Sequence, residues 1–290
     1  MSTSVNLLYQ FAGSFAFLVL SALGLAIIFG MMGIINMAHG ELIMLGAYAT
    51  IFARNAGVPL PIAIILGALA VGVFGIILER SIIRHLYNRP LDSIVATLGL
   101  SFIISQGMQI IFGPSMQGDT TPLGHFSVGE NSYSVYQIVL ALISLALIGG
   151  LYLVFKYTDY GLQARATMQN AQIARSLGVN VDLIYMLTFG LGSALAGLTG
   201  GLYESMMTTA PTLGSSFIVQ AFITVVVGGS NVLLGTAMSA GALGLINAVL
   251  SSYYGTYVGL IGLLLATIVL IRVLPTGISG FAAQRSRAGK

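Results

Sequence analysis

Charged side chains are scarce in this chain. Its 290 residues include only 11 Lys or Arg and 8 Asp or Glu, which is 7%, whereas a soluble domain carries about 25%. Hydrophobic residues make up 57%, and the mean hydropathy is +0.96. A soluble fold of this size could not bury so much apolar surface. The composition therefore excludes a soluble globular enzyme and a disordered chain, and it indicates a polytopic membrane protein.

Cysteine and tryptophan are absent. Without Cys, the chain can form neither a disulfide framework nor a thiolate metal site. Without Trp, anchoring at the membrane surface falls to the 13 Tyr. No Lys or Arg precedes Arg54, so the N-terminus lacks the basic region of a signal peptide. The net charge of +3 is small, so we expect no nucleic-acid partner and interpret the basic residues as topology signals.

Long continuous apolar runs predict helices rather than a β-barrel, whose strands alternate apolar and polar residues. A crossing helix needs about 20 mainly apolar residues. We therefore expect an all-α polytopic membrane protein, with about eight transmembrane helices plus broken or re-entrant half-helices, in a single domain over residues 1–290. The block at 217–251 is too long for one crossing, and its break at 228–231 predicts a half-helix followed by a full helix. The apolar blocks are 6–29, 37–54, 59–83, 92–112, 134–156, 184–205, 217–251 and 256–273.

The placement of Lys and Arg predicts the orientation in the membrane, because cytoplasmic loops carry an excess of both. Three segments hold most of them, and we place these segments in the cytoplasm. The loop at 113–133 carries Asp119 and Glu130 but no Lys or Arg, so we place it outside. This count puts the N-terminus outside and the C-terminus in the cytoplasm, with Arg54 as the outside exception. The cytoplasmic cations are Arg80, Arg84, Arg89, Lys156, Arg165, Arg175, Arg285, Arg287 and Lys290.

Polar residues interrupt the chain where the second apolar block begins. Asn36, His39 and Glu41 lie within a few residues of Gly33 and Gly40. Asn36 is placed to cap the following helix by accepting from an amide two or three residues on, and Glu41 then lies near the positive end of that helix. This pattern predicts a broken helix lining a polar space. The alternative is a short cytoplasmic turn in which Glu41 is solvated.

The same polar residues do not predict a metal site or a catalytic site. His39 and Glu41 are two residues apart and do not share a helix face, and no second His lies nearby. We expect no metal and no catalytic residue, and we interpret the polar residues as lining a translocation path, although interhelical hydrogen bonds would explain most of them equally well. We expect Glu204 to be solvated at an outer helix end. The candidate path residues are Asn36, His39, Glu41, Thr97, Ser101, Gln106, Ser193 and Asn247.

The sizeable cytoplasmic loop covers residues 157–183. Asn170 favours a helix N-terminus and Gly178 a helix stop, which predicts about two helical turns between them. We expect Asp182 to cap the next membrane helix. A short capped helix that projects from a membrane protein is typical of a docking element for another protein, and the alternative is a loop that packs against its own bundle. The apolar stripe and its neighbouring cation are Ala171, Ala174, Leu177 and Arg175.

Glycine is abundant, with 37 residues, about twice the usual share of roughly 7%. In membranes such an excess is typical of close helix packing. Small residues four positions apart are the expected contact points. These pairs are Gly192 and Ala196, Gly197 and Gly201, Gly235 and Ser239, and Gly255 and Gly259.

The stretch 34–41 followed by 45–48 resembles the membrane-permease subunits of ABC importers for branched-chain amino acids and urea. The segment 164–178 resembles the ATPase-contacting loop of that family, and 188–197, 227–229 and 274–278 continue the similarity, which covers about residues 7–278. Within the family, 79–114 is more similar to the urea-type permeases than to the leucine-type.

The resemblance implies a non-catalytic permease subunit that moves a small polar solute. Our main interpretation is urea or a short-chain amide, and the alternative is a branched-chain amino acid. It also implies a bacterial inner-membrane location among membrane lipid, a second homologous permease forming a heterodimer, and a periplasmic or lipid-anchored solute-binding protein. Two cytoplasmic ATP-binding subunits would hold ATP and Mg, because this chain carries no Gly-x-x-x-x-Gly-Lys-Ser/Thr pattern and is expected to bind no cofactor. The implied ATPase-coupling residues are Arg165, Asn170, Ala171, Ala174, Arg175, Leu177 and Gly178.

Three other classes remain as competitors. A stand-alone urea channel or facilitator would transport without partner ATPases. A proton-coupled transporter places ionisable groups inside its bundle, and only Glu41 and His39 are available for that role. An intramembrane enzyme would need a nucleophile–base pair, which the sequence does not offer.

Overall fold

The computed structural model describes residues 2–87, 89–118, 121–128, 131–229 and 231–281. Asp119, Glu130 and the tail cations Arg285, Arg287 and Lys290, which entered the orientation prediction, lie outside the described residues. Contacts divide the chain into two compact units. Unit 1 comprises residues 1–22, 121–149 and 220–290, and unit 2 comprises 23–120 and 150–219.

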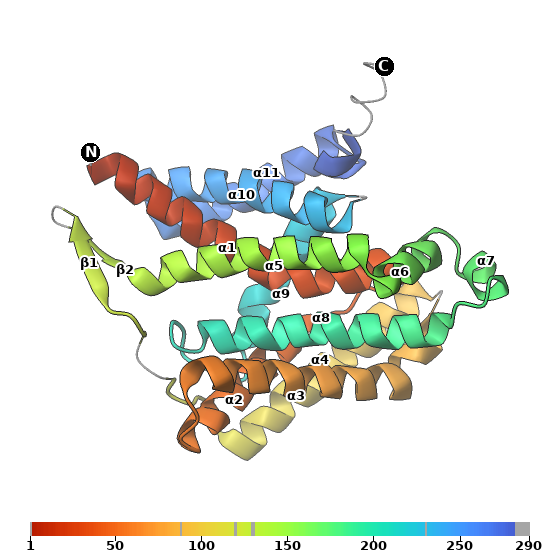
Figure 1. The fold of residues 1–290 in the computed structure, drawn as a ribbon. Helices are drawn as coiled ribbons and strands as arrows, with labels where there is room; N and C mark the ends of the chain where they lie inside the picture. Colours follow the sequence, from red (N-terminus) through yellow and green to blue (C-terminus); the bar gives the residue numbers. More distant parts are fainter. Residues whose placement is uncertain (1, 88, 119–120, 129–130, 230, 282–290) are drawn as a thin grey trace. The chain divides into compact units, whose positions relative to one another are not determined.

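Helices form nearly all of the described secondary structure (Figure 1), which confirms the all-α polytopic prediction. Seven of the described helices are long and apolar enough to cross a membrane. Helices α2 and α9, with 17 and 16 residues, are only about 25 Å long at 1.5 Å per residue. The helices are α1 (Ser2–Met32), α2 (His39–Asn55), α3 (Leu60–Ser81), α4 (Pro90–Phe112), α5 (Val135–Tyr157), α6 (Asp159–Gln169), α7 (Ala171–Ser176), α8 (Val181–Tyr203), α9 (Leu213–Gly228), α10 (Val232–Tyr254) and α11 (Thr256–Val273), with a 3₁₀ helix η1 (Ile83–Leu86).

The break predicted inside 217–251 is present. Helix α9 ends at Gly228, and α10 begins at Val232. The side chain of Asn231 accepts a hydrogen bond from the amide of Leu234 at 3.1 Å and so caps α10. The prediction of a short helix followed by a full one is therefore confirmed.

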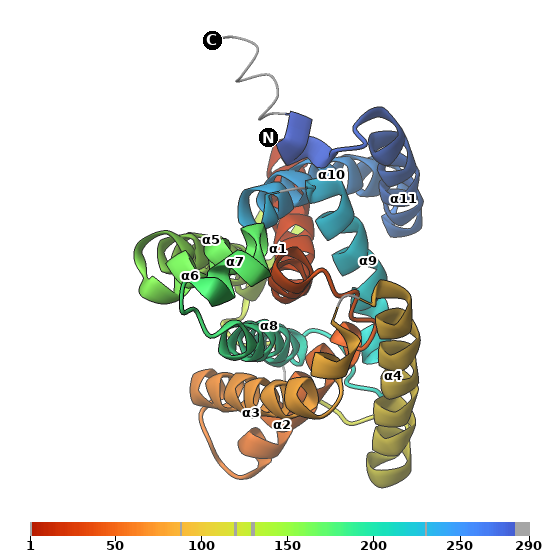
Figure 2. The same cartoon turned by 90° about the vertical axis from the view of Figure 1, so that its right-hand side faces the viewer.

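In unit 2, helix α8 lies along both α2 and α3 (Figures 1 and 2). Glycines let the backbones touch. A β-carbon on Gly200 would collide with the carbonyl oxygen of Ile43, and one on Gly197 would lie 2.8 Å from Cβ of Val71. Gly192 likewise packs against Gly24 of α1. The small residues predicted as contact points on α8 are therefore contact points.

Unit 1 contains the pair of helices α10 and α11, and a short antiparallel hairpin formed by β1 (His125–Val128) and β2 (Asn131–Ser134). Gly235 packs against the backbone of Gly228, and Gly259 packs against Ser251, as their spacing predicts. Gly255 is different, because it lies in the turn between α10 and α11 with φ +91° and nothing within 4 Å of its missing side chain. Its interpretation as a packing residue is wrong.

Candidate functional site

The chain breaks between α1 and α2, in unit 2. Gly33 has φ +65°, a conformation that glycine adopts readily. The side chain of Asn36 accepts from the amide of Ala38 at 3.1 Å, two residues on, as predicted. However, α2 begins at His39 and its N-cap position is Ala38, without a side-chain cap. Asn36 therefore shapes the turn before the helix and does not cap it.

Helix α4 forms hydrogen bonds with the residues around this break. The amide of Met37 donates to the hydroxyl of Thr97 at 3.0 Å. One turn further along α4, the hydroxyl of Ser101 donates to Oε1 of Glu41 at 2.9 Å. Five of the predicted path residues thus come together, and we refer to Asn36, His39, Glu41, Thr97 and Ser101 as the polar cluster.

Four of the five residues of the polar cluster are buried, and the fifth, Ser101, is half-exposed at mid-height of a spanning helix. Glu41 is 7% exposed, and Asn36, His39 and Thr97 are buried. Ser101 is the midpoint of the 23 residues of α4. A solvated Glu41 in a cytoplasmic turn does not describe this geometry, whereas a broken helix with buried polar groups does.

Buried atoms without a hydrogen-bond partner among the described residues occur on both Asn36 and Glu41. They are Nδ2 of Asn36, a donor, and Oε2 of Glu41, an acceptor. Buried polar atoms are nearly always bonded to protein or to ordered water. The cluster can therefore offer one donor and one acceptor to water or to a passing solute.

Three other predicted path residues lie elsewhere. Gln106 is exposed on α4, away from the face that carries Thr97 and Ser101. Ser193 is buried on α8, where it packs against Gly75 of α3. Asn247 belongs to unit 1, and its Oδ1 accepts from the hydroxyl of Ser251 at 2.9 Å.

The prediction of a solvated Glu204 is wrong. Glu204 follows the last residue of α8 and is only 1% exposed. Gly118 packs directly against it. The hydropathy pattern places it at a helix end but gives no information on the loop that covers that end.

The helix predicted between Asn170 and Gly178 is present as α7. The side chain of Asn170 accepts from the amides of Gln172 and Ile173, both at 3.0 Å, and Gly178 ends the segment with φ +89°. A second helix, α6, precedes it and was missed. Its signal is Thr158, whose hydroxyl accepts from the amide of Gly161 at 3.1 Å as an N-cap.

The apolar stripe of α7 differs from the predicted one. Ala174 is 2% exposed and packs inward, whereas Leu177 is 78% exposed and Ile173 is 59% exposed. Ile173 and Leu177 are four residues apart and share a helix face. We refer to these two side chains as the α7 pair, which replaces the predicted stripe of Ala171, Ala174 and Leu177 as the exposed apolar surface at α7.

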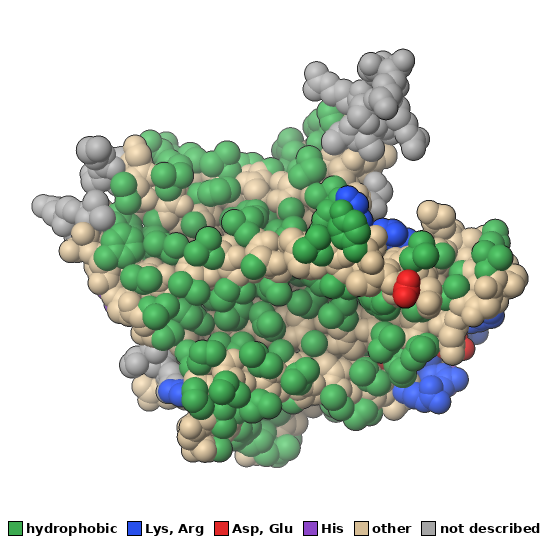
Figure 3. Space-filling view, in the orientation of Figure 1, with side chains coloured by type: hydrophobic (Ala, Val, Ile, Leu, Met, Phe, Trp, Pro, Cys, Tyr) green, Lys and Arg blue, Asp and Glu red, His purple; other side chains and the backbone are tan. Residues whose placement is uncertain are grey.

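An ion pair links the last turn of α7 to the first turn of α8. Arg175 donates to Asp182 at 2.9 Å, and both side chains are exposed. Asp182 therefore pairs with Arg175, and the N-cap of α8 is instead Asn180, which accepts from the amide of Leu183 at 3.1 Å. Figure 3 shows Lys and Arg side chains gathered at the end of unit 2 where α6 and α7 lie. Arg165 of α6 is one of the exposed cations of this loop.

An aromatic contact near the same end was missed by the sequence reasoning. The hydroxyl of Tyr87 donates to the buried carboxylate of Glu79, and its ring meets that of Tyr185 edge-on, with centroids 4.9 Å apart. Burial raises the pKa of Tyr87, and the hydrogen bond and charge of Glu79 raise it further. The hydroxyl therefore stays protonated and joins the end of α3 to the chain before α4.

Within the described ranges, no three His, Cys, Asp or Glu side chains are grouped so that they could hold a metal ion. His39 is buried at the start of α2, with its imidazole beside Gly24 of α1.

Comparisons with known proteins give the chain a family. A family model described as the permease component of a branched-chain amino acid transport system matches residues 7–274. The high-affinity branched-chain amino acid transport system permease protein LivH of Escherichia coli K12 is 28% identical over 279 residues, covering 90% of each chain.

Two further relatives agree. The protein BraD of Pseudomonas aeruginosa, named for the same kind of system, is 28% identical over 90% of this chain and 91% of its own. A probable LivH of Methanocaldococcus jannaschii is 28% identical over 91% and 88%. No solved structure gives a significant match. With the family model covering most of the helices described above, the chain belongs to the family of branched-chain amino acid transport permeases.

Proposed function

We propose that this chain is the permease subunit of an ABC importer that carries branched-chain amino acids across a bacterial inner membrane. The match of the family model over residues 7–274 carries this proposal. The relatives named above are all permeases of branched-chain amino acid systems. They support the alternative in our sequence interpretation, and the main interpretation, urea or a short-chain amide, receives no support from them.

The proposal assigns the polar cluster to the translocation path. A zwitterionic amino acid needs hydrogen-bond and charge partners once it leaves water. Asn36 and Glu41 offer a spare donor and a spare acceptor, at the mid-height where transporters commonly bind their substrates. The remaining path candidates Gln106, Ser193 and Asn247 have no such support.

The proposal also assigns the energy source to other chains. Two cytoplasmic ATP-binding subunits would hold ATP and Mg, and the α7 pair, Ile173 and Leu177, is the apolar surface suited to entering a groove on one of them. A second homologous permease and a solute-binding protein would complete the importer. We place the N-terminus outside and the C-terminus inside, with residues 1–290 acting as one permease domain and 157–183 as its coupling loop.

Uptake measurements test the substrate. The chain is expressed with its partner subunits in cells that lack branched-chain amino acid transporters, and uptake of radiolabelled leucine, isoleucine, valine and urea is compared with cells that lack only this chain. We expect chain-dependent uptake of the three amino acids and none of urea. Chain-dependent uptake of urea without uptake of leucine would overturn the proposed substrate. Uptake in the absence of the ATP-binding subunits would favour a stand-alone channel.

Co-purification tests the docking surface. Ile173→Asp together with Leu177→Asp is expected to remove most ATP-binding subunit from the purified complex, because each change places a charge on an apolar contact. Gln172→Asp together with Ser176→Asp is the matched control, since it adds the same two charges to exposed positions of α7 without removing an apolar side chain. Equal recovery of the ATP-binding subunit with all variants would place the docking surface elsewhere.

A further inference from the structure

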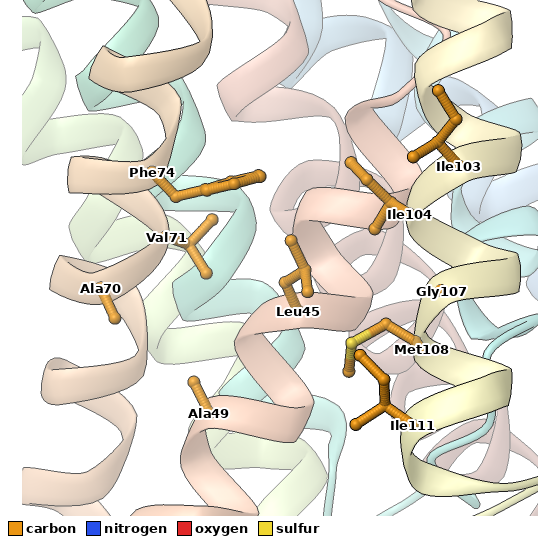
Figure 4. Close-up of a pocket in the computed structure, with 10 residues that line it drawn as sticks. All are labelled: Leu45, Ala49, Ala70, Val71, Phe74, Ile103, Ile104, Gly107, Met108 and Ile111. Atoms are coloured by element: carbon orange, nitrogen blue, oxygen red, sulfur yellow. The ribbon is translucent and has the colours of Figure 1, made fainter.

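A cleft in unit 2 lies between α2, α3 and α4, outside the polar cluster. It has a volume of about 350 Å³. Figure 4 shows Val71 and Phe74 of α3 and Ile104 and Met108 of α4 reaching toward each other over α2. The other lining residues are Leu45, Ala49, Ala70, Ile103, Gly107 and Ile111, so no lining residue carries a charge or a hydrogen-bonding side chain.

The floor of the cleft is the incompletely covered strip in the middle of α2. From His39 to Ile51, nearly every residue of α2 is buried, and the half-exposed exceptions are Leu45 and Ala49. Those two residues are four apart and therefore lie on one face. An apolar strip beside a spanning helix does not hold water, because apolar cavities stay dry, and an empty gap forfeits dispersion contacts on all its walls.

Both ends of the cleft are closed by contacts between α2 and α4. At one end, Ser101 donates to Glu41. At the other end, the ring of Phe112 meets those of Tyr48 and Phe52, with centroids 5.7 and 5.0 Å apart. Between these contacts the two helices stand apart, so α4 needs something to fill the space behind it.

The dimensions select a thin occupant. The lining residues of α4 run from Ile103 to Ile111, which is about 12 Å of helix. Dividing the volume of about 350 Å³ by this length gives a cross-section of about 30 Å². A helix with its side chains is 10–12 Å wide, or roughly 80 Å² or more in cross-section, so the whole body of a helix is too wide for the cleft. A single hydrocarbon chain is much thinner than a helix.

The chemistry of the lining excludes a substrate. An amino acid or urea in this cleft would find no partner for its polar groups, and burying them unpaired is costly. The surrounding bilayer offers an occupant without polar groups along its length. We propose that this cleft binds one acyl chain of a membrane lipid, which fills the space between α2 and α4 and holds α4 at its distance.

Two glycines of α4 provide a matched pair of substitutions. Gly107 lines the cleft and Gly99 does not. At both positions an added β-carbon meets nothing within 4 Å, so a leucine fits at either. Gly107→Leu fills the cleft, whereas Gly99→Leu adds the same side chain to the same helix outside it.

Tryptophan fluorescence reports the occupant, because the chain has no Trp of its own. Phe74→Trp places a reporter in the cleft, and Phe102→Trp places one on the exposed flank of α4. Each full chain is reconstituted into phosphatidylcholine vesicles with bromine at mid-chain. We expect quenching of both reporters, a loss of at least half of the quenching at Phe74→Trp when Gly107→Leu is added, and no change with Gly99→Leu. Quenching of the Phe102→Trp reporter should change with neither Gly107→Leu nor Gly99→Leu.

Several outcomes overturn the proposal. The first two are an unquenched Phe74→Trp reporter and quenching that is unchanged by Gly107→Leu. Relief of quenching by free leucine added to the vesicles would indicate a substrate site instead. Relief of quenching by the second permease would indicate a subunit interface. If Gly107→Leu fails to fold, Ala49→Leu fills the cleft from its floor and carries the same expectation. The measurement needs no transport, so it succeeds or fails independently of the proposed function.

Discussion

Helix α2 meets α8 on one side and α4 on another, and the two contacts use different chemistry. Toward α8 the backbones touch, with Gly46 against Gly197 and Ile43 against Gly200. Toward α4 the contact consists of hydrogen bonds at the polar cluster, aromatic rings at Phe112 and the apolar cleft between them.

The difference separates a rigid side from a movable one. A backbone in van der Waals contact cannot slide without collision, so α2 and α8 must shift together. Hydrogen bonds can be exchanged for others one at a time, and a cleft can open or narrow. Because α4 carries Thr97 and Ser101, any displacement of α4 changes the polar cluster directly.

The largest effect is expected on the rigid side. Gly200→Leu would drive a side chain into the carbonyl of Ile43 and the amide of Ala47. Overpacking typically costs 1–3 kcal/mol, and the backbone here cannot yield, so we expect about 3 kcal/mol or more and loss of folded protein. Size-exclusion chromatography of the purified chain measures this. Gly99→Leu, in open space, is the control, and equal yields would show that α2 and α8 are less closely packed.

A large effect on transport, with the fold kept, is expected at the cluster. Glu41→Ala removes the carboxylate that accepts from Ser101. It also removes Oε2, the acceptor proposed for the solute. A hydrogen bond to the charged amino group of leucine contributes about 1.5–3 kcal/mol, so we expect leucine uptake to fall roughly 10- to 100-fold. Gln106→Ala, exposed on α4, should leave uptake unchanged. If the Glu41→Ala variant takes up leucine at the parental rate, the polar cluster is not part of the translocation path.

A smaller effect is expected from the hydroxyl that holds the break to α4. Thr97→Val keeps the shape but leaves the amide of Met37 without its acceptor, which costs about 1–3 kcal/mol for a buried group. The melting temperature of the purified chain should fall by several degrees. Thr267→Val is the matched control, because the hydroxyl of Thr267 bonds to a carbonyl of its own helix, that of Leu263. Equal shifts would mean that the bond between Met37 and Thr97 contributes nothing specific.

The smallest effect is expected at the aromatic end. Phe112→Leu keeps most of the buried apolar area and loses the ring contacts with Tyr48 and Phe52, each contributing about 0.5–1.5 kcal/mol. Since Phe112 is only half-buried, we expect at most about 1 kcal/mol and a shift of one to three degrees. Phe102→Leu on the exposed flank should give no shift. A larger fall in melting temperature for Phe112→Leu than for Thr97→Val would mean that the aromatic contact stabilises the protein more than the polar cluster does.

Local chemistry made much of the fold predictable. Continuous apolar runs predicted the spanning helices, because a helix in lipid satisfies its own backbone. Asn170 marked the start of α7 correctly, because an N-cap depends only on a few neighbouring residues. Helix α6 was missed because its polar residues, such as Gln163 and Arg165, resemble those of a loop.

Packing made the rest unpredictable. Whether Ala174 or Leu177 faces outward depends on what α7 lies against, which the spacing along the chain does not contain. The same applies to Gln106, which has the right chemistry for a path but the wrong face of α4, and to Glu204, which another loop covers. Substrate preference was also out of reach, since likeness over 79–114 carries no chemistry of the solute, and the relatives favour branched-chain amino acids over urea.

Asn170 has one further consequence. It is the single residue between the end of α6 and the start of α7, and its backbone is extended, with φ −161° and ψ 105°. The direction of α7 relative to α6 therefore depends on the two torsion angles of one residue. Changing these two angles reorients α7, and the exposed Arg175–Asp182 ion pair links α7 to the first turn of α8.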